Sequence, residues 1–298
     1  MAGQEVRIEH NELRRFCAEL LEAVGVPAQD AALTATIQVE ADLRGVYSHG
    51  SRAIPRYVRN IRHASTNPRA HITITKEGPA YALLDGDYGL GQVVAYKAME
   101  LAIQKADEAT VAAVGVQRSS HFGAAAYYTV MAAEAGMIGF ATSVGGSANQ
   151  AAYGGRNPVL GNSPLSYAIP AGEEPPIVLD MATGLSAHGK IPLARMAGEL
   201  LPAGYFMTRE GEDTRDPAVA AVVMPTGGPK GFGLALTMDT LAGIMLGDVA
   251  ACHKNRREPD EPLSAGHFFL AIRVASFRPL DEFKAEIDRQ IRTIRAST

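Results

Sequence analysis

The stretch HITITKEGPAYALLDGDYG, residues 71–89, decides the class of fold that this chain adopts. Polar and apolar residues alternate along it, and glycine-containing turns interrupt and end it, which predicts two short strands in succession. A second succession follows at residues 164–182, where PLSYAIP and PIVLDMA each have the length and composition of a strand. Strands that arrive in adjacent pairs, with helices between the pairs, favour an α/β or α+β fold with a sheet of mixed direction.

Helices are predicted on both sides of these strands. Between residues 11 and 24 the apolar side chains fall on one face at helical spacing, and Asn11 is the expected N-cap. The residues of that face are Leu13, Phe16, Leu20, Leu21 and Val24. Other helices are expected at residues 28–43, 92–105, 230–247 and 280–295, and further strands at 110–117 and 266–274.

Length and composition bound the class of protein. The chain has 298 residues, 47% hydrophobic and 20% charged, as in an ordinary globular protein. Its formal net charge of -4 argues against nucleic-acid binding through bulk electrostatics. Cys17 and Cys252 are too few for a disulfide framework, which favours a reducing cytoplasm. The polar N-terminus and the lack of a run of about 18 apolar residues predict neither export nor a membrane span.

Two glycine-rich segments invite comparison with dinucleotide-binding folds: GPKGFG at residues 228–233 and VGGS at residues 144–147. Neither has the full glycine spacing between a strand and a helix, with an acidic residue about 20 positions further on. The sequence therefore predicts that a dinucleotide site in this chain is not built on a standard Rossmann unit.

Residues suited to chemistry gather in four loop segments that each contain glycine. They are SHGSRAIPRY (48–57), SSHFG (119–123), LDMATGLSAHGK (179–190) and GGPKGFG (227–233). Glycine lets backbone N–H groups approach a ligand closely, and histidine exchanges a proton near neutral pH. Each segment alone is also typical of a solvated turn, and Arg52 with Arg56 of a basic helix face. The combination of two histidines, glycine turns and Lys230 before a buried helix favours a functional site.

A metal centre and a nucleophilic triad are both disfavoured. The histidines lie far apart in the sequence, and no HExxH segment, CxxC pair or carboxylate cluster occurs at ligand spacing. Ser48 adjoins His49, and no GxSxG turn surrounds any serine. Ser48 is therefore expected to orient His49 rather than to attack a substrate.

Six segments, taken in order, resemble the malate/L-lactate dehydrogenase family of the type that includes sulfolactate and ureidoglycolate dehydrogenases. They are DLRGVYSHG, SSHFGAAAYY, GNSP, VLDMATGLSAHGK, PTGGPKGFGL and GHFFLAI, and the similarity extends from about residue 8 to about residue 290. The resemblance implies an oxidoreductase with NAD or NADP as cofactor that acts on small 2-oxo or 2-hydroxy acids. It also implies a homodimer and a non-Rossmann, largely antiparallel mixed sheet in the cofactor domain, with helical N- and C-terminal segments packed together.

The same resemblance assigns roles to single residues. His49 would donate a proton to the 2-oxo oxygen, with Ser48 orienting its ring. The alternative is that His121 serves as the acid or base, as in some relatives. Arg52 and Tyr57 would bind the substrate. The implied reaction joins hydride delivery from nicotinamide to C2 with protonation of the developing alkoxide, while a cation holds the carboxylate. The implied cofactor contacts are His121, Phe122, Gly123, Asp180, Met181, Ala182, Lys230 and Gly231, and no metal is expected.

Three parts are expected along the chain. Residues 1–65 with 276–298 would form a helical substrate and dimerisation part, residues 66–115 a small α/β part, and residues 116–275 the cofactor-binding domain.

Four departures from the family pattern bear on these expectations. Ala53 stands where relatives carry an arginine five places after the serine, and Arg52 lies one place earlier. Lys190 replaces the acidic residue of imine-reducing members, which favours a hydroxy acid over a cyclic imine. GNSP (161–164) replaces GTNP. The sequence ends at Thr298, before the PGE-bearing segment that closes over the cofactor in relatives, and lack of that segment would weaken cofactor binding or abolish activity.

Two alternatives stay open on the sequence. One is an NAD(P)H-dependent reductase of cyclic imino acids, of the Δ1-piperideine-2-carboxylate type, on the same fold. The other is a degenerate, non-catalytic relative that serves as a binding or assembly subunit. The sequence selects neither NAD nor NADP, and it does not select the acid.

Overall fold

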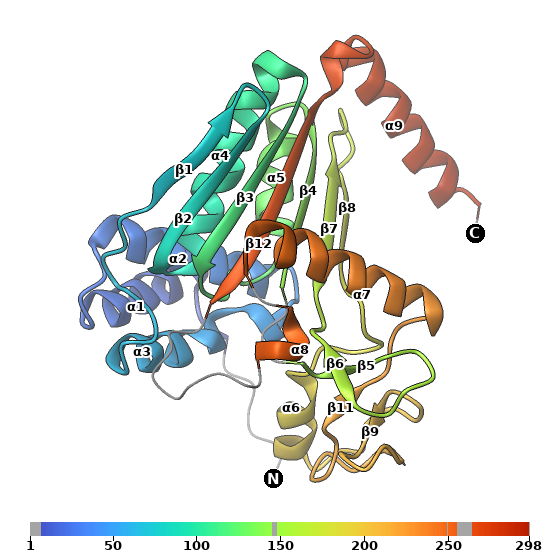
Figure 1. Ribbon diagram of the computed structural model, residues 1–298. Coiled ribbons are helices and arrows are strands. Elements are labelled where there is room, and N and C mark those ends of the chain that lie inside the picture. The colour runs from blue at the N-terminus through green and yellow to red at the C-terminus, as the bar shows by residue number, and fades with distance from the viewer. Residues whose placement is uncertain (1–6, 145–147, 249, 255–263, 298) are drawn as a thin grey trace.

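The computed structural model describes residues 7–144, 148–248, 250–254 and 264–297, which form a large sheet, a small sheet and the helices around them (Figure 1). The α-helices are α1 (His10–Glu22), α2 (Ala28–Leu43), α3 (Ile54–Arg62), α4 (Gly91–Ala109), α5 (Ala126–Glu134), α6 (Lys190–Ala197), α7 (Pro229–Ala242), α8 (Ala251–Lys254) and α9 (Leu280–Arg295). The strands are β1 (Thr73–Gly78), β2 (Tyr81–Gly89), β3 (Val111–Ser119), β4 (Met137–Ser143), β5 (Gln150–Ala151), β6 (Pro158–Leu160), β7 (Pro164–Ile169), β8 (Ile177–Ala182), β9 (Phe206–Met207), β10 (Asp213–Thr214), β11 (Val222–Val223) and β12 (Ala265–Arg273). The 3-10 helices are η1 (Tyr47–His49), η2 (Ser51–Ala53), η3 (Ile244–Leu246) and η4 (Val274–Ser276).

The large sheet has the strand order β1-β2-β3-β12-β4-β7-β8. Among its described strands, β2 and β3 run parallel and the other neighbouring pairs are antiparallel. The prediction of a mixed sheet rich in antiparallel pairs is therefore confirmed, and the two predicted strand successions are β1·β2 and β7·β8. β12 pairs with both β3 and β4, so a strand from the end of the chain lies at the centre of the sheet.

Helices α4 and α5 cover one face of the large sheet (Figure 1). Alanines on α4, including Ala95, Ala98 and Ala102, are fully buried and let this helix approach the strands closely. Phe269 of β12 is also fully buried in the same core. Truncating such an aromatic side chain to alanine costs about 3–5 kcal/mol of unfolding free energy, which makes β12 central to stability.

The small sheet has the order β10-β9-β11-β5-β6 and lies beyond one end of the large sheet, beside α6 (Figure 1). Its own core is formed by four buried side chains, which are Ile191, Leu201, Phe206 and Val223. This second sheet supports the loops that precede α6 and α7, where two of the four sequence-predicted loop segments lie.

Helix α1 begins two residues earlier than the predicted cap implies, and its cap differs. The carboxylate of Glu9 accepts a hydrogen bond from the Glu12 backbone N–H at 2.8 Å, so Glu9 is the N-cap and the prediction of Asn11 is wrong. Most of the predicted apolar face is confirmed, since Leu13, Leu20, Leu21 and Val24 pack in the core. Phe16 is the exception at 56% exposed, and Cys17 is buried instead. The buried strip follows i, i+4 spacing through Cys17 and Leu21, toward α2 and α3.

Helix α9 does not pack on the N-terminal helices, so that expectation is wrong within this chain. It lies at the opposite end of the large sheet from α1 and α3 (Figure 1). The Asp288 carboxylate accepts hydrogen bonds from the backbone N–H groups of residues 172, 173 and 174, at 2.9, 2.8 and 3.2 Å. Arg292 also pairs with Glu173 and Glu174, so α9 is attached to the turn between β7 and β8.

Candidate active site

The SHG segment lies in the turn that follows α2, where the chain passes through η1 and η2. Asp42, near the end of α2, accepts a hydrogen bond from the Ser51 backbone N–H at 2.9 Å through Oδ2. Gly50 packs on the same carboxylate, because a Cβ at this position would lie 1.7 Å from Asp42 Oδ1. Asp42 and Gly50 therefore fix the turn that presents His49.

His49 and His121 are far apart in the sequence but stack on each other, with ring centroids 5.5 Å apart and 20° between the ring planes. His121 lies in the loop between β3 and α5. Gly91, the first residue of α4, supports this loop, since a Cβ there would lie 2.2 Å from the Ser120 carbonyl oxygen. The structure thus brings the two sequence-predicted histidines together, and both rings stay partly exposed.

Hydrogen bonds engage the Nδ1 atom of each ring. Ser48 Oγ lies 2.9 Å from His49 Nδ1. His121 Nδ1 accepts the Gly123 backbone N–H at 3.2 Å and lies 2.8 Å from the Tyr57 hydroxyl oxygen. Because a backbone N–H only donates, His121 Nδ1 carries no proton, and the proton of the neutral ring resides on Nε2. His121 therefore presents an N–H donor on the edge opposite Gly123.

Tyr57 is buried beneath His121 and is only 3% exposed. Its hydroxyl oxygen lies 3.1 Å from the side-chain amide of Gln38, which is itself fully buried. A residue buried to this extent offers little surface to a substrate. The contacts of Tyr57 indicate that it acts through His121, by fixing which ring nitrogen carries the proton.

Burial and nearby cations lower the pKa of both histidines. For His49, burial is the main cause, followed by the guanidinium groups of Arg56 and Arg52. For His121, burial lowers the pKa well below the usual value, with further lowering by Arg56, His49 and His267. His121 thus stays neutral at physiological pH, whereas His49 is the ring better suited to carry and release a proton.

The loop before α6 lies beside the SHG turn. A Cβ on Gly189 would lie 3.9 Å from Ser48 Cβ. Asn162, from the GNSP segment, holds this loop by donating to the Ser186 carbonyl at 2.8 Å and accepting the Gly184 N–H at 2.7 Å. Sequence reasoning assigned no role to Asn162. The signal that could have found it is its place in GNSP, a segment that differs from the family form.

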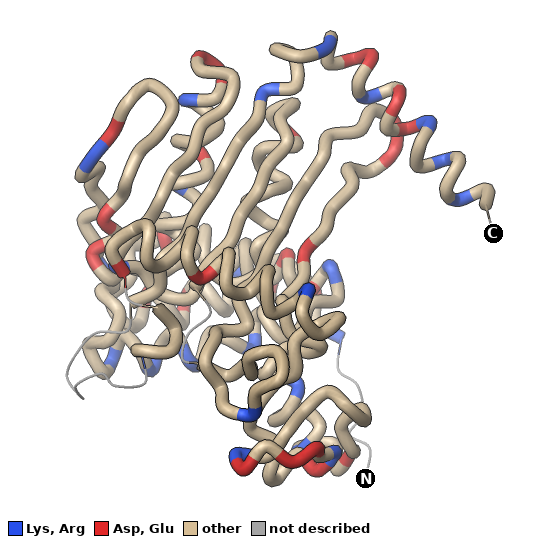
Figure 2. Tube along the Cα trace, turned by 45° about the vertical axis from the view of Figure 1, so that its right-hand side comes forward, with Lys and Arg blue, Asp and Glu red and all other residues tan. Residues whose placement is uncertain are grey.

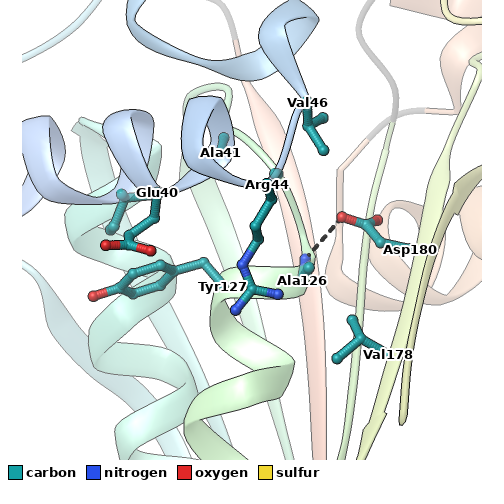
Figure 3. Close-up of a pocket in the computed structure, with 10 residues that line it drawn as sticks. Glu40, Ala41, Arg44, Val46, Ala126, Tyr127, Val178 and Asp180 are labelled. Carbon is teal, nitrogen blue, oxygen red and sulfur yellow. Dashed lines mark hydrogen bonds between the residues drawn. The ribbon is translucent and has the colours of Figure 1, made fainter. Parts of the chain in front are cut away.

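Asp180 of β8 lies at the start of α5, where its Oδ2 atom accepts the Ala126 N–H at 3.0 Å (Figure 3). Burial raises the pKa of this carboxyl group, and the Ala126 N–H and Arg44 oppose that shift. Asp180 lines a pocket of about 260 Å³ into which Arg44 extends from the end of α2 (Figure 3). Val46, two residues before Ser48, lines the same pocket, so the pocket adjoins the SHG turn.

The strand that carries Asp180, Met181 and Ala182 continues to the turn before α7. The Thr226 N–H donates to the Thr183 carbonyl at 3.0 Å, and the Gly231 N–H donates to the Thr226 carbonyl at 2.8 Å. A side chain at position 231 would clash, because its Cβ would lie 2.4 Å from the Thr226 oxygen. The predicted cofactor contacts on β8 and α7 are therefore contiguous in space.

Lys230 is exposed in the first turn of α7, and the two preceding glycines, Gly227 and Gly228, have φ values of 55° and 61° that favour glycine. A second cavity of about 460 Å³ borders this turn and is lined by Gly228, Tyr153 and Arg156, among others. The VGGS segment singled out in the sequence lies mostly outside the described residues, since residues 145–147 are not among them.

Phe122 is placed in the core rather than at a free surface. Its ring stacks on His267 with centroids 4.6 Å apart and on Tyr128 at 5.2 Å, and it is 2% exposed. We therefore leave Phe122 out of the cofactor contacts, although its neighbours His121 and Gly123 stay in the candidate site. His267 itself is fully buried, and burial lowers its pKa to about 3.

Several features of other classes of protein are absent from the part of the chain that the structure describes. No group of three or more His, Cys, Asp or Glu side chains could hold a metal ion there. Over the same residues, no helix is both long and apolar enough to cross a membrane. Cys17 is buried and Cys252 exposed, and both are free thiols.

Comparison with known proteins defines the class. The family model described as malate/L-lactate dehydrogenase matches residues 8–298. The malate dehydrogenase of Pyrococcus abyssi is 41% identical, over 98% of this chain and 83% of that protein. The L-sulfolactate dehydrogenase of Methanocaldococcus jannaschii is 39% identical, over 95% of this chain and 83% of its own. The solved structure of malate dehydrogenase from Pyrococcus horikoshii OT3 superposes with a TM-score of 0.88 at 37% identity, covering 98% of this chain and 83% of that one.

A mixed α/β fold with paired histidines beside glycine-rich turns is thus that of a dehydrogenase. The chain belongs to the malate/L-lactate dehydrogenase family. The family resemblance drawn from the motifs, and the class of oxidoreductase that it implied, are both confirmed.

Proposed function

We propose that this chain is an NAD(P)-dependent dehydrogenase that interconverts a small 2-oxo acid and its 2-hydroxy acid. The observation that carries the proposal is the stacked pair of His49 and His121, because it offers one ring that can transfer a proton and a second, neutral ring that can donate a hydrogen bond. Relatives named malate and sulfolactate dehydrogenases, at 41% and 39% identity, support this substrate class.

The residues present fit a nicotinamide dinucleotide. Arg156 lines the 460 Å³ cavity beside the turn before α7, and exposed Lys230 lies two residues after Gly228, which lines the same cavity. Cations of this kind suit the phosphates of a dinucleotide. We propose that Asp180, Met181, Ala182, Lys230, Gly231, His121 and Gly123 contact the cofactor. NAD and NADP are both compatible, since relatives named for each occur in the family.

A bound nicotinamide ring would supply or accept hydride at C2 of the substrate. In the reducing direction, His49 donates its proton to the substrate oxygen, and the Ser48 hydroxyl at Nδ1 holds the ring in place. The Nε2–H of His121 donates a hydrogen bond to the same oxygen as negative charge develops on it. General acid catalysis by His49 contributes about 10²- to 10⁴-fold to the rate. Arg52 and Arg56 are both available to attract the substrate carboxylate.

We further propose a homodimer. One row of paired residues crosses the face of the large sheet opposite α4 and α5, and three of them are 41–52% exposed. In register order these residues are Tyr81, Ala113, Leu270, Phe140, Tyr167 and Leu179. The central strands carry almost no charge between their ends (Figure 2), so this face suits burial against a second copy. Sedimentation equilibrium tests this, and a strictly monomeric protein would contradict it.

We also propose how the chain divides into functional parts. Residues 1–65 carry the SHG turn, and residues 116–275 carry the cofactor contacts, on a sheet plan that we take to be non-Rossmann because of its antiparallel pairs. A boundary at 115/116 would fall inside β3, so we place the limit of the cofactor part before that strand. The two free thiols support a cytoplasmic location, which cell fractionation would test.

Cofactor titration followed by turnover tests the function. Quenching or enhancement of NADH or NADPH fluorescence measures binding, and loss of nicotinamide absorbance with pyruvate, oxaloacetate or glyoxylate measures reduction. A parallel assay with Δ1-piperideine-2-carboxylate covers the imine alternative, which the names of the relatives do not favour. His49→Ala is expected to lower turnover by about 10²- to 10⁴-fold while cofactor binding survives. Absence of binding by either cofactor would refute the proposal.

A further inference from the structure

The guanidinium group of Arg56 adjoins the histidine pair through Tyr57. Its Cζ atom lies 5.4 Å from the centroid of the Tyr57 ring, on the first turn of α3. The Tyr57 hydroxyl is 2.8 Å from His121 Nδ1, and His121 stacks on His49 at 5.5 Å. A permanent cation therefore packs on the ring whose hydroxyl contacts His121, one of the two rings that we assign to the substrate oxygen.

We propose that Arg56, rather than Arg52, binds the carboxylate of the substrate. The inference rests on the proposed function, because it presumes a small 2-oxo or 2-hydroxy acid at the histidine pair. The carboxylate of such an acid is one bond from the carbonyl carbon, so a cation that binds it must lie beside the groups that contact the carbonyl oxygen. Arg56 meets that requirement through its packing on Tyr57.

The donors of Arg56 are available for such a ligand. Its side chain is exposed, and within the described part of the chain it forms no ion pair with a carboxylate. Guanidinium carries five N–H donors in a planar fork that matches a carboxylate, and contact with one phenol ring leaves most of them free. The ring of Tyr57 is buried and fixed, so it limits the positions that the guanidinium adopts.

Arg52 has a weaker claim. It is exposed on η2 and has no aromatic ring holding its guanidinium among the described contacts. The effects on the histidines agree with this difference. Arg56 precedes Arg52 among the cations that lower the pKa of His49, and it alone of these two lowers the pKa of His121. This order agrees with the contact of Arg56 with Tyr57, whose hydroxyl lies beside His121.

Steady-state kinetics of four variants test the assignment. Arg56→Gln is expected to raise the KM for the 2-oxo acid about 10- to 100-fold, the loss of a charged bidentate contact, while the dissociation constant of the cofactor stays unchanged. The KM for the corresponding 2-oxo amide, which lacks the charge, should not rise. Arg56→Lys should fall between, because it keeps the charge and loses the fork. Arg59→Gln, at an exposed arginine on the same helix, should stay within about 3-fold of the unmodified protein, and Arg52→Gln should raise the KM less than Arg56→Gln does.

The outcomes separate this inference from the function beneath it. If the unmodified protein binds no cofactor and reduces no 2-oxo acid, both fail together. If it reduces the acid but Arg56→Gln keeps the same KM, or if Arg52→Gln shows the rise instead, the assignment of Arg56 is wrong and the dehydrogenase activity stands. Thermal unfolding of each variant shows whether it is folded, and the exposed position of Arg56 favours intact folding.

Discussion

Replacing Tyr57 by phenylalanine removes one buried oxygen and leaves the ring in place. That oxygen lies 2.8 Å from His121 Nδ1 and 3.1 Å from the Gln38 amide. The Arg56 guanidinium keeps its aromatic support, since the ring remains. The hydroxyl also contacts the Arg56 and Gln92 side chains, so the effect on His121 is read from kcat, and the KM shows whether Arg56 is disturbed.

The expected magnitudes follow from these two contacts. A neutral hydrogen bond contributes about 0.5–1.5 kcal/mol, and a buried polar group left without its partner costs about 1–3 kcal/mol. The unfolding free energy should thus fall by about 1–3 kcal/mol. His121 Nδ1 keeps only the Gly123 N–H as donor, so its preferred proton position weakens by about 1 kcal/mol, which corresponds to a 5- to 10-fold fall in kcat. The KM should change little.

Urea unfolding and steady-state kinetics measure the two effects, and Tyr128→Phe is the matched control. Tyr128 is fully buried and its hydroxyl donates to the Phe122 carbonyl, so the control loses a buried hydrogen bond without touching His121 Nδ1. It should lose similar stability and retain its kcat. If Tyr57→Phe lost no more activity than Tyr128→Phe, the role given to Tyr57 would be refuted.

Two further predictions concern the scaffold around the pair. Gly91→Ala should lower the unfolding free energy by about 1–3 kcal/mol and reduce kcat, because its Cβ would lie 2.2 Å from the Ser120 oxygen. The control Gly233→Ala should be neutral or stabilising, because a Cβ there meets no atom within 4 Å. Equal effects of the two substitutions would contradict this reasoning. Burial lowers the pKa of His267 to about 3 in the folded protein, from about 6.5 in the unfolded chain. The resulting stability is complete above pH 6.5 and is lost as the pH falls toward 3, by about 2 kcal/mol at pH 5. Urea unfolding of the unmodified protein and His267→Gln between pH 5 and 7.5 should give a smaller loss for the variant, and parallel curves would exclude His267 as the cause.

Local patterns in the sequence predicted most of the helices and strands, and tertiary contacts decided the rest. Strand alternation at 71–89 correctly predicted β1 and β2, because their polar and apolar periods are set by neighbouring residues. The position of β12 between β3 and β4 depends on pairing across long stretches of chain, which no local pattern encodes. The cap of α1 is likewise decided by structure beyond the local pattern. The side chains of Glu9 and Asn11 can both accept a hydrogen bond at a helix N-terminus, and the backbone conformation places Glu9 in the cap position.

The candidate site shows the same limit. The motifs predicted that His49 and His121 matter, but not that their rings stack or that Tyr57 lies beneath one of them. Arg56 illustrates a signal that the sequence did contain. It lies three residues after Ala53, the position where the family resemblance expects arginine, about one helical turn further along the chain. Reading helical spacing from the altered position would have directed attention to Arg56 as well as to Arg52.

The loop that carries His121 is held in place by β12, the central strand of the large sheet. His267 of β12 contacts Ser143 of β4 through Nδ1 at 2.9 Å, and Ser119 of β3 and the Ser120 carbonyl through Nε2 at 3.0 and 3.1 Å. Its ring also stacks on Phe122, the residue after His121. The backbone on both sides of His121 is therefore held by β12. Because β12 pairs with β3 and β4 across a long stretch of chain, we expect the loop that carries His121 to be ordered only when these three strands have paired.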